Sequence, residues 1–200
     1  MDTDHPVVFV LAGPNGAGKS TAAPVLIHEV AGIERYINAD AIARGLSPFD
    51  PAMSAVAAGR VMLRHMDELA EERRSFAIET TLSGVRLAKR LERLREDGYQ
   101  IHMIYLWLPS AQLAIERVAQ RVRLGGHSID EQVIKRRYFR SLENFLKIYR
   151  PLARSWRVYD NAGPSPMAIA SGSGDTVRTD DTEKWESFLE QAKFGAKDYE

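Results

Sequence analysis

The stretch "GPNGAGKST" at residues 13–21, directly after the apolar run Val7–Ala12, constrains the fold of this chain more than any other feature. A short apolar run that is rich in β-branched residues and ends at a glycine is typical of a strand buried in a parallel sheet. The stretch itself satisfies G-x-x-x-x-G-K-[ST], and the residues that follow it have helical spacing. A strand, a glycine-rich loop and a helix in this order predict a P-loop, which wraps its backbone around phosphate groups.

Each part of this loop has a chemical task. The glycines let backbone N–H groups point at phosphate oxygens, and the positive end of the following helix adds to the attraction. We expect Lys19 to bridge the outer phosphates of ATP (or GTP) and Ser20 to bind Mg²⁺. The predicted nucleotide-binding residues are Gly13, Pro14, Asn15, Gly16, Ala17, Gly18, Lys19, Ser20 and Thr21.

Strand-like and helix-like patterns alternate along the chain. The predicted strands are 7–12, 35–38, 75–79, 101–108 and 156–159, and the predicted helices between them are 19–30, 51–73, 85–97, 110–124 and 129–149. This alternation predicts an α/β protein with the P-loop NTPase or kinase fold, in which helices flank a five-stranded parallel sheet.

The chain is expected to form one domain over residues 1–200. Its length of 200 residues and its 44% hydrophobic content suit a single core. Within this domain, the two helices over about 110–150 meet at Gly125 and Gly126, which predicts a helical-hairpin lid that can move. The remainder, about 162–200, is expected to be a small C-terminal extension with a strand pair and a helix. The "NAGPSP" loop that precedes it is placed to contact adenine.

Composition excludes several function classes. Lys and Arg together number 27, as do Asp and Glu, so the overall charge gives no reason to expect nucleic acid or an anionic membrane as the main partner. The absence of cysteine excludes disulfides, thiolate metal sites and cysteine nucleophiles. The first apolar run is too short for a signal sequence or a membrane span. Together with ATP chemistry, this predicts a cytoplasmic protein.

Asp40 follows the second predicted strand in "YINAD". Ligands of open parallel sheets bind at the carboxyl ends of the strands, where Asp40 is expected to lie beside the P-loop. A carboxylate at this place can take the proton of an acceptor hydroxyl during phosphoryl transfer. The alternative is that Asp40 caps the helix that begins after it.

The third predicted strand ends in Glu79, followed by Thr80 and Thr81. Glu79 is expected to contact Mg²⁺ through the water around the ion, or to accept hydrogen bonds from substrate hydroxyls. With Thr80 and Thr81 it forms a polar edge that is predicted to bind substrate. The alternative is a solvated strand end, since charged residues commonly end strands.

Arginines on the predicted helical hairpin are candidates for neutralising the negative charge of the phosphoryl group during its transfer. Arg121 and Arg123 are the first candidates because they are nearest to the glycine pair, and Arg117 shares a helix face with Arg121. His127, after the glycine pair, is expected either to touch phosphate or to support the turn. The alternative for the arginines is pairing with neighbours such as Glu116.

Six stretches together resemble the zeta-toxin family of P-loop kinases. They cover most of Val7 to Asn161 and read "GPNGAGKST", "NADAIARGLSP", "FAIETTLSG", "GYQIHMIYLWLPSAQLAIERVAQRVRLGGHSI", "RRYFRSLENFLKIYRPLARSW" and "VYDN". The resemblance implies a kinase that depends on ATP and Mg²⁺. The best-known members phosphorylate the 3′-hydroxyl of the sugar in UDP-N-acetylglucosamine, and a small antitoxin protein usually neutralises them.

The resemblance also implies roles for individual residues. Lys19 and Ser20 fall on the family's nucleotide loop, and Asp40 falls on its proposed base. "GGHSI" replaces a longer segment between the family's two phosphate-binding arginines, so two pairs stay open. These pairs are Arg117 with Arg121 and Arg123 with Arg136.

The sequence therefore predicts a phosphotransferase with an alcohol group as acceptor, acting as the toxin of a toxin-antitoxin pair. Two alternatives stay open: a P-loop kinase of another acceptor, such as a nucleotide or a nucleic-acid end, and an ATPase or nucleotide-binding switch. An ATPase of the ABC transporter type is disfavoured. The stretch "TTLSG" resembles the start of the ABC signature, but no apolar strand that ends in Asp-Glu follows it.

Overall fold

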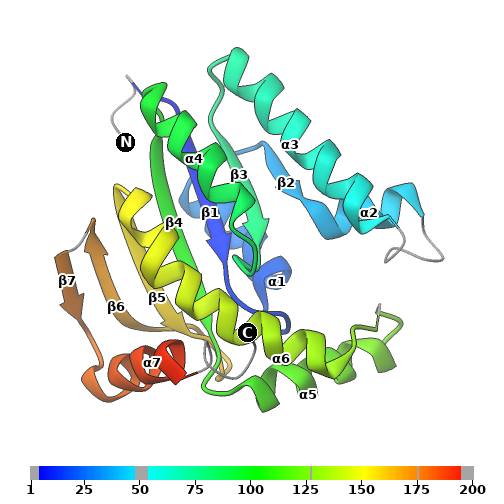
Figure 1. Ribbon diagram of the computed structural model, residues 1–200, viewed down its shortest axis with the longest axis vertical. Coiled ribbons are helices and arrows are strands. Elements are labelled where there is room, and N and C mark those ends of the chain that lie inside the picture. Colours follow the sequence, from blue (N-terminus) through cyan, green and yellow to red (C-terminus); the bar gives the residue numbers. More distant parts are fainter. Residues whose placement is uncertain (1–4, 48–53, 127, 175, 195–200) are drawn as a thin grey trace.

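A seven-stranded sheet runs through the centre of the protein (Figure 1). The computed structural model describes residues 5–47, 54–126, 128–174 and 176–194. The spatial order of the strands is β2-β3-β1-β4-β5-β6-β7. Their bounds are β1 Val7–Ala12, β2 Tyr36–Asn38, β3 Phe76–Thr80, β4 Gln100–Trp107, β5 Ser155–Asp160, β6 Met167–Ser173 and β7 Thr176–Thr179.

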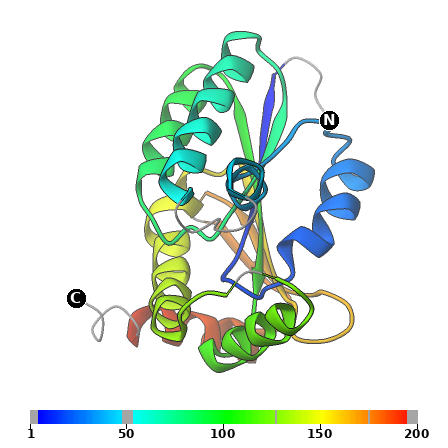
Figure 2. The ribbon, with the colours of Figure 1, turned by 90° about the vertical axis from the view of Figure 1, so that its right-hand side faces the viewer.

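Helices cover both faces of this sheet. Figure 2 shows α3, α4 and α6 on one face and α1 with the π-helical segment η1 on the other. In the described part of the chain, no helix is both long and apolar enough to cross a lipid bilayer. The helical bounds are α1 Lys19–Ala23, η1 Pro24–Val30, α2 Ala39–Leu46, α3 Ala55–Glu71, α4 Arg86–Glu96, α5 Ala111–Arg123, α6 Glu131–Asn144, η2 Phe145–Tyr149, η3 Arg150–Leu152 and α7 Thr182–Phe194.

β1 lies in the middle of the parallel part of the sheet. All of its residues are buried, and it pairs in parallel with β3 on one side and with β4 on the other. Because helices cover both faces, side chains pointing in either direction must be apolar, which explains the continuous apolar run. Leu11 is paired with Glu79, so the polar end of β3 lies beside the loop that follows β1.

The predicted five-stranded parallel sheet is confirmed for β1 to β5. The predicted C-terminal strand pair also exists, and it extends the same sheet. β6 pairs antiparallel with β5, and β7 pairs antiparallel with β6, so both strands continue the same sheet. The C-terminal helix α7 likewise joins the core, because Phe188 is fully buried and packs edge-on against Tyr105 and Trp107.

Two helical predictions need adjustment. The helix predicted over 19–30 changes to a π-helix at Pro24, because proline has no N–H to donate to the preceding turn. The helix predicted over 51–73 begins at Ala55, while residues 48–53 lie outside the described part of the chain. The segment after β2 forms α2, which the sequence indicated only through the alternative role of Asp40.

The second helix of the predicted lid is anchored in the core. The hydroxyl of Tyr138 on α6 lies 2.5 Å from the carbonyl oxygen of Leu108, and the hydroxyl of Ser141 lies 2.6 Å from that of Tyr105. The lid over 110–150 stays a prediction, and these contacts hold its second helix, α6, against the core. His127 lies outside the described residues.

The packing of α7 allows a test of whether this helix is part of the single folded domain. Replacing Phe188 with alanine (Phe188→Ala) removes a ring that is 0% exposed, which should lower the free energy of unfolding by about 3–5 kcal/mol. Glu190→Ala on the exposed side of the same helix should change it by less than about 0.5 kcal/mol. Urea unfolding followed by fluorescence measures both variants. Equal effects would mean that α7 is an appendage.

Candidate active site

The P-loop occupies the turn between β1 and α1, at the carboxyl end of the central strand. Gly13 has a φ of 142°, and a Cβ atom there would lie 2.2 Å from the carbonyl oxygen of Leu106. Gly18 has a φ of 82° directly before the first turn of α1. Only glycine fits the first position, and the left-handed backbone at the second turns the chain into the helix.

Lys19 lies inside this loop. Its side chain is buried, and Nζ donates hydrogen bonds of 2.9 Å to the carbonyl oxygens of Gly13 and Pro14. Burial lowers the pKa of Lys19, while the carboxylates of Glu79 and Asp40 act in the opposite direction. The ammonium group is thus held by the loop that encloses it, where it can bridge a phosphate chain.

Glu79 is the centre of a hydrogen-bond network at the end of β3. Its two carboxylate oxygens accept from Ser20 Oγ at 3.0 and 3.1 Å, and Oε2 accepts from Asn38 Nδ2 at 2.9 Å. Oε2 also accepts from the hydroxyl of Tyr36. Burial, and then the hydrogen bond to Glu79, raise the pKa of Tyr36, so its phenol remains a donor at neutral pH. Sequence reasoning missed Tyr36 and Asn38, although both stand in "YINAD".

The donor set around Ser20 fits Mg²⁺. Mg²⁺ prefers oxygen ligands and usually binds through one or two protein groups together with substrate phosphates and water. Ser20 Oγ and the Glu79 carboxylate supply oxygen only. Among the described residues there is no cluster of three or more His, Cys, Asp or Glu side chains that could hold a metal by itself. The site therefore suits a metal that arrives with a phosphate ligand.

Asp40 does not cap α2. The N-cap is Asn38, whose Oδ1 accepts from the backbone N–H groups of Asp40 at 2.8 Å and Ala41 at 3.1 Å. The alternative prediction that Asp40 caps this helix is thus wrong, because Asn38 is the capping residue. The Asp40 side chain is exposed, and within the described part of the chain its carboxylate accepts no hydrogen bond. This carboxylate is available to a ligand.

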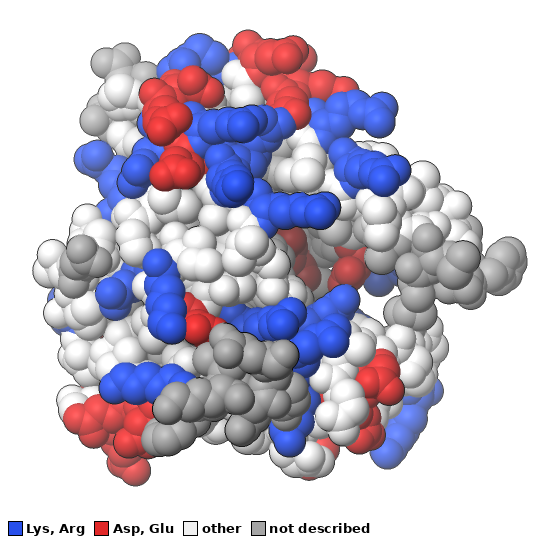
Figure 3. All heavy atoms as spheres, in the orientation of Figure 1, with Lys and Arg blue, Asp and Glu red and all other residues white. Residues whose placement is uncertain are grey.

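Two adjoining cavities open around these residues. The first, of about 450 Å³, is lined by Asn15, Gly16, Gly18, Lys19, Ser20, Thr21, Asp40, Glu79, Arg117, Gln120, Arg121 and Leu124. The second, of about 200 Å³, is lined by Asn15, Lys19, Asn38, Ala39, Asp40, Met62, Glu79, Thr80, Thr81, Ser83 and Arg137. Figure 3 shows a hollow on this face, with acidic side chains inside it and Lys and Arg side chains around it. We call the first the phosphate cavity and the second the acceptor cavity.

The predicted arginines are placed differently from one another. Arg117 and Arg121 line the phosphate cavity, and the charge of Arg121 acts on Lys19. Arg123 on α5 is exposed and lines neither cavity. The same holds for Arg136 on α6. The structure therefore brings the pair Arg117 and Arg121 to the P-loop.

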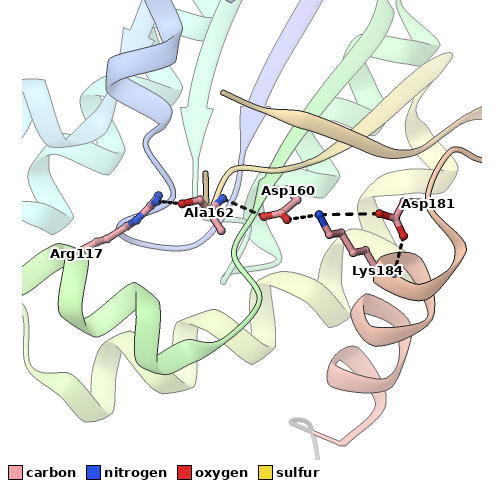
Figure 4. A network of polar contacts seen from close by, with 5 residues as sticks. All are labelled: Arg117, Asp160, Ala162, Asp181 and Lys184. Atoms are coloured by element: carbon pink, nitrogen blue, oxygen red, sulfur yellow. Dashed lines mark hydrogen bonds and ion pairs between the residues drawn. The ribbon is translucent and has the colours of Figure 1, made fainter. Parts of the chain in front are cut away.

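Arg117 also holds the loop that follows β5. Its guanidinium donates to the carbonyl oxygens of Asn161 at 2.8 Å and Ala162 at 2.7 Å. Asp160 accepts from the backbone N–H of Ala162 at 2.9 Å and pairs with Lys184 of α7 at 2.9 Å, which raises the pKa of Lys184 (Figure 4). Asn161 Nδ2 donates to the carbonyl oxygen of Ala17 at 2.7 Å. The loop is thus fixed to the P-loop, α5 and α7.

The acceptor cavity contains the predicted substrate residues Thr80 and Thr81, together with residues that the sequence analysis did not select. Those residues are Asn38, Ala39, Met62, Ser83 and Arg137. Met62 is mostly buried and forms part of the cavity wall. Arg137 stands in the quoted stretch "RRYFRSLENFLKIYRPLARSW", but it reaches the acceptor cavity through the packing of α6, which the stretch alone does not indicate.

Comparison with protein families identifies a match over most of the chain. A family model described as an AAA domain matches residues 8–141, from β1 through most of α6. An uncharacterized protein of Haemophilus influenzae is 30% identical over 126 residues, which cover 63% of this chain and 88% of that protein.

Solved structures share the fold at low sequence identity. AvrRxo1-ORF1:AvrRxo1-ORF2 with ATP aligns with a TM-score of 0.72 and 17% identity, covering 94% of this chain and 64% of that chain. This chain thus spans less than two thirds of the length of that solved chain. The PezAT chromosomal toxin-antitoxin system of Streptococcus pneumoniae aligns with a TM-score of 0.66 and 15% identity, covering 98% of this chain and 87% of that chain. These similarities confirm the P-loop kinase fold and its resemblance to the zeta-toxin kinases.

The hydrogen-bond network around Glu79 allows a test of Mg²⁺ binding. Glu79→Gln replaces one of two acceptor oxygens by an NH₂ group that faces other donors, so Ser20 loses its orientation. The Mg²⁺ concentration needed for half-maximal ATP turnover should rise roughly 10- to 100-fold. Glu116→Gln, at an exposed carboxylate of α5, is the control and should leave it unchanged. An unchanged Mg²⁺ requirement in Glu79→Gln would refute the assignment.

Proposed function

The chain belongs to this AAA domain family, and from that premise we propose that it is a kinase that transfers the γ-phosphate of ATP to a hydroxyl group of a small molecule. One observation supports this most strongly. The phosphate cavity and the acceptor cavity meet at four shared residues, which are Asn15, Lys19, Asp40 and Glu79. A nucleotide on one side and an acceptor on the other would therefore face each other across Lys19 and Asp40.

The phosphate cavity has the cations that a triphosphate requires. Lys19 and the loop N–H groups would bind the outer phosphates, with Arg117 and Arg121 on the α5 side. Ser20 would hold Mg²⁺, oriented by Glu79, and the ion when bound neutralises phosphate charge. The loop after β5 would contact the adenine ring of ATP, since Asn161 fixes this loop beside the P-loop. GTP stays an alternative nucleotide.

Asp40 is the proposed base. The acceptor hydroxyl would give its proton to the Asp40 carboxylate while its oxygen forms a bond to the γ-phosphorus, and the bond from that phosphorus to the β,γ-bridging oxygen breaks. The products are a phosphate ester and ADP. Lys19 and Arg121 would stabilise the charge that spreads over the phosphoryl oxygens. An exposed carboxylate without a partner in the described chain suits this task, because no hydrogen bond has to be broken first.

We further propose a sugar nucleotide such as UDP-N-acetylglucosamine as acceptor, and the role of a toxin that a small antitoxin protein neutralises. The support is the fold shared with the PezAT toxin-antitoxin system and with the AvrRxo1-ORF1:AvrRxo1-ORF2 complex. The use of ATP and of a cytosolic metabolite would place this activity in the cytoplasm.

Product analysis tests this function. The protein is incubated with γ-labelled ATP, Mg²⁺ and a panel of UDP-sugars, nucleotides and oligonucleotides, and labelled products are identified by mass spectrometry. A phosphorylated UDP-sugar is expected. A labelled nucleotide or oligonucleotide end would instead indicate a kinase of another acceptor. Free phosphate without any phosphorylated product would indicate an ATPase or switch and would overturn the proposal.

Variants at the shared residues separate binding from transfer. Lys19→Ala should abolish turnover, because no other cation in the described P-loop reaches the outer phosphates. Asp40→Asn should bind ATP with a Kd within about twofold of the original, while transfer falls roughly 10²- to 10⁴-fold because proton removal is lost. Calorimetric titration and product formation measure the two quantities. Transfer at the original rate in Asp40→Asn would show that Asp40 is not the base.

A further inference from the structure

A single carboxylate joins the C-terminal helix α7 to the loop that follows β5 (Figure 4). Asp160 is the last residue of β5, and its side chain is only 9% exposed. Its Oδ2 lies 2.9 Å from Nζ of Lys184 on α7, while its Oδ1 accepts at 2.9 Å from the backbone N–H of Ala162 in the loop. The two oxygens of one buried group thus hold a cation of α7 and the backbone of the loop.

We propose that Lys184, acting through Asp160, is a positioning residue for the nucleotide, because it fixes the loop after β5 against the base of ATP. This inference rests on the proposed function, in which that loop contacts the adenine ring. It extends the nucleotide site to α7, which lies outside residues 8–141 of the family match. Lys184 lines neither the phosphate cavity nor the acceptor cavity, so its influence on a ligand has to pass through the loop.

Asp160 depends on Lys184 because its carboxylate is buried. Among the described residues, Lys184 is the only cation that forms an ion pair with it. A buried carboxylate that loses its cation costs free energy, and it is relieved by taking up a proton or by turning toward water. Turning toward water would break the hydrogen bond to Ala162, and a protonated carboxyl would accept from that N–H less strongly. Either response loosens the loop.

The first turn of α7 has a fixed place relative to the sheet. The backbone N–H groups of Asp180 and Asp181 donate to the carbonyl oxygen of Ile169 on β6, at 3.0 and 3.1 Å. Asp181 Oδ1 in turn accepts from the backbone N–H of Lys184 at 3.1 Å, and its Oδ2 lies 3.9 Å from Nζ (Figure 4). Lys184 is therefore held firmly enough to position the carboxylate of Asp160.

Apolar packing, rather than this ion pair, attaches α7 to the core. Phe188 is fully buried, and Trp185 stacks on Trp156 of β5 with ring centroids 5.9 Å apart. Buried aromatic rings contribute several kcal/mol each to the free energy of unfolding, about 3–5 kcal/mol when one is removed. Loss of the ion pair is therefore expected to disturb the loop and to leave the helix in place.

The phosphate-binding groups are held by contacts of their own. Lys19 Nζ donates to carbonyl oxygens of the P-loop, and Ser20 donates to Glu79. One hydrogen bond, from Asn161 to the carbonyl oxygen of Ala17, links the loop after β5 to the P-loop. A shift of that loop should therefore weaken binding of the base more than binding of the triphosphate. Inorganic tripolyphosphate, which has no base, then distinguishes a displaced loop from a general loss of structure.

Calorimetric titration of matched lysine variants tests this inference. The variants are Lys184→Gln and Lys193→Gln, the latter at an exposed residue of the same helix. The ligands are a non-hydrolysable ATP analogue and inorganic tripolyphosphate, each with Mg²⁺. Lys184→Gln should raise the Kd of the ATP analogue roughly 3- to 30-fold, the range for residues that act on a ligand through others, and change the Kd of tripolyphosphate by less than about twofold. Lys193→Gln should change neither.

Comparison of the two ligands decides the outcome. Equal weakening of both in Lys184→Gln would mean a general structural role and overturns the inference, as does an unchanged Kd of the ATP analogue. If the original protein binds the ATP analogue no more tightly than tripolyphosphate, the inference also fails, because there is no base contact to position. No acceptor is present, so a selective loss of ATP-analogue binding supports the inference even without transfer, in which case the kinase function alone fails.

A carboxylate variant tests whether Lys184 acts through Asp160. Asp160→Asn keeps an oxygen that can accept from Ala162 but weakens the link to Lys184, so it should also raise the Kd of the ATP analogue and spare tripolyphosphate. It leaves no unpaired buried charge, which keeps the test available if Lys184→Gln does not fold. In the double variant the two effects should not multiply, because both substitutions break the same link. Multiplied effects would mean separate routes and overturn the role of Asp160.

Discussion

The carboxylate of Glu79 is the group on which the rest of the site depends. It is buried, and it accepts hydrogen bonds from α1, through Ser20, and from β2, through Tyr36 and Asn38. A carboxylate in such a place is tolerable only because these donors replace water. In return it holds together three segments that are far apart in the sequence. Asn38, positioned by this network, caps α2 and thereby sets the place of Asp40.

Charge divides the site into two unlike parts. Lys19, Arg117 and Arg121 gather on the phosphate side, while Asp40 and Glu79 stand at the junction with the acceptor cavity. Lys19 and Glu79 are buried, so little water screens their charges, whereas Asp40 and Arg121 are exposed. The loop after β5 adds rigidity, since Arg117 and Lys184 hold it from opposite sides (Figure 4). The Lys19 cation and the oxygens of Ser20 and Glu79 are thus held in place by contacts within the protein.

Much of the fold was predictable because its signals are local. The run of β1, the P-loop and the amphipathic helices each follow from short stretches of sequence. The arginines show the limit of such reasoning. Arg123 was chosen for its nearness to the glycine pair, but two residues along a helix turn by about 200°, which points it away from the face shared by Arg117 and Arg121. The lid prediction took α5 and α6 as one unit, whereas Tyr138 anchors α6 in the core.

By itself, the sequence determined the strand, glycine loop and helix that cradle phosphate, the alternation that makes a parallel sheet, and Asp40 and Glu79 at the ends of neighbouring strands. These follow from local sterics and from the rule that parallel strands end at one edge. Only the tertiary structure decided that Asn38 rather than Asp40 caps α2, that β6 and β7 continue the sheet, and that Arg137 enters the acceptor cavity. Each of these depends on contacts between segments distant in the chain, and no short stretch of sequence carries that information.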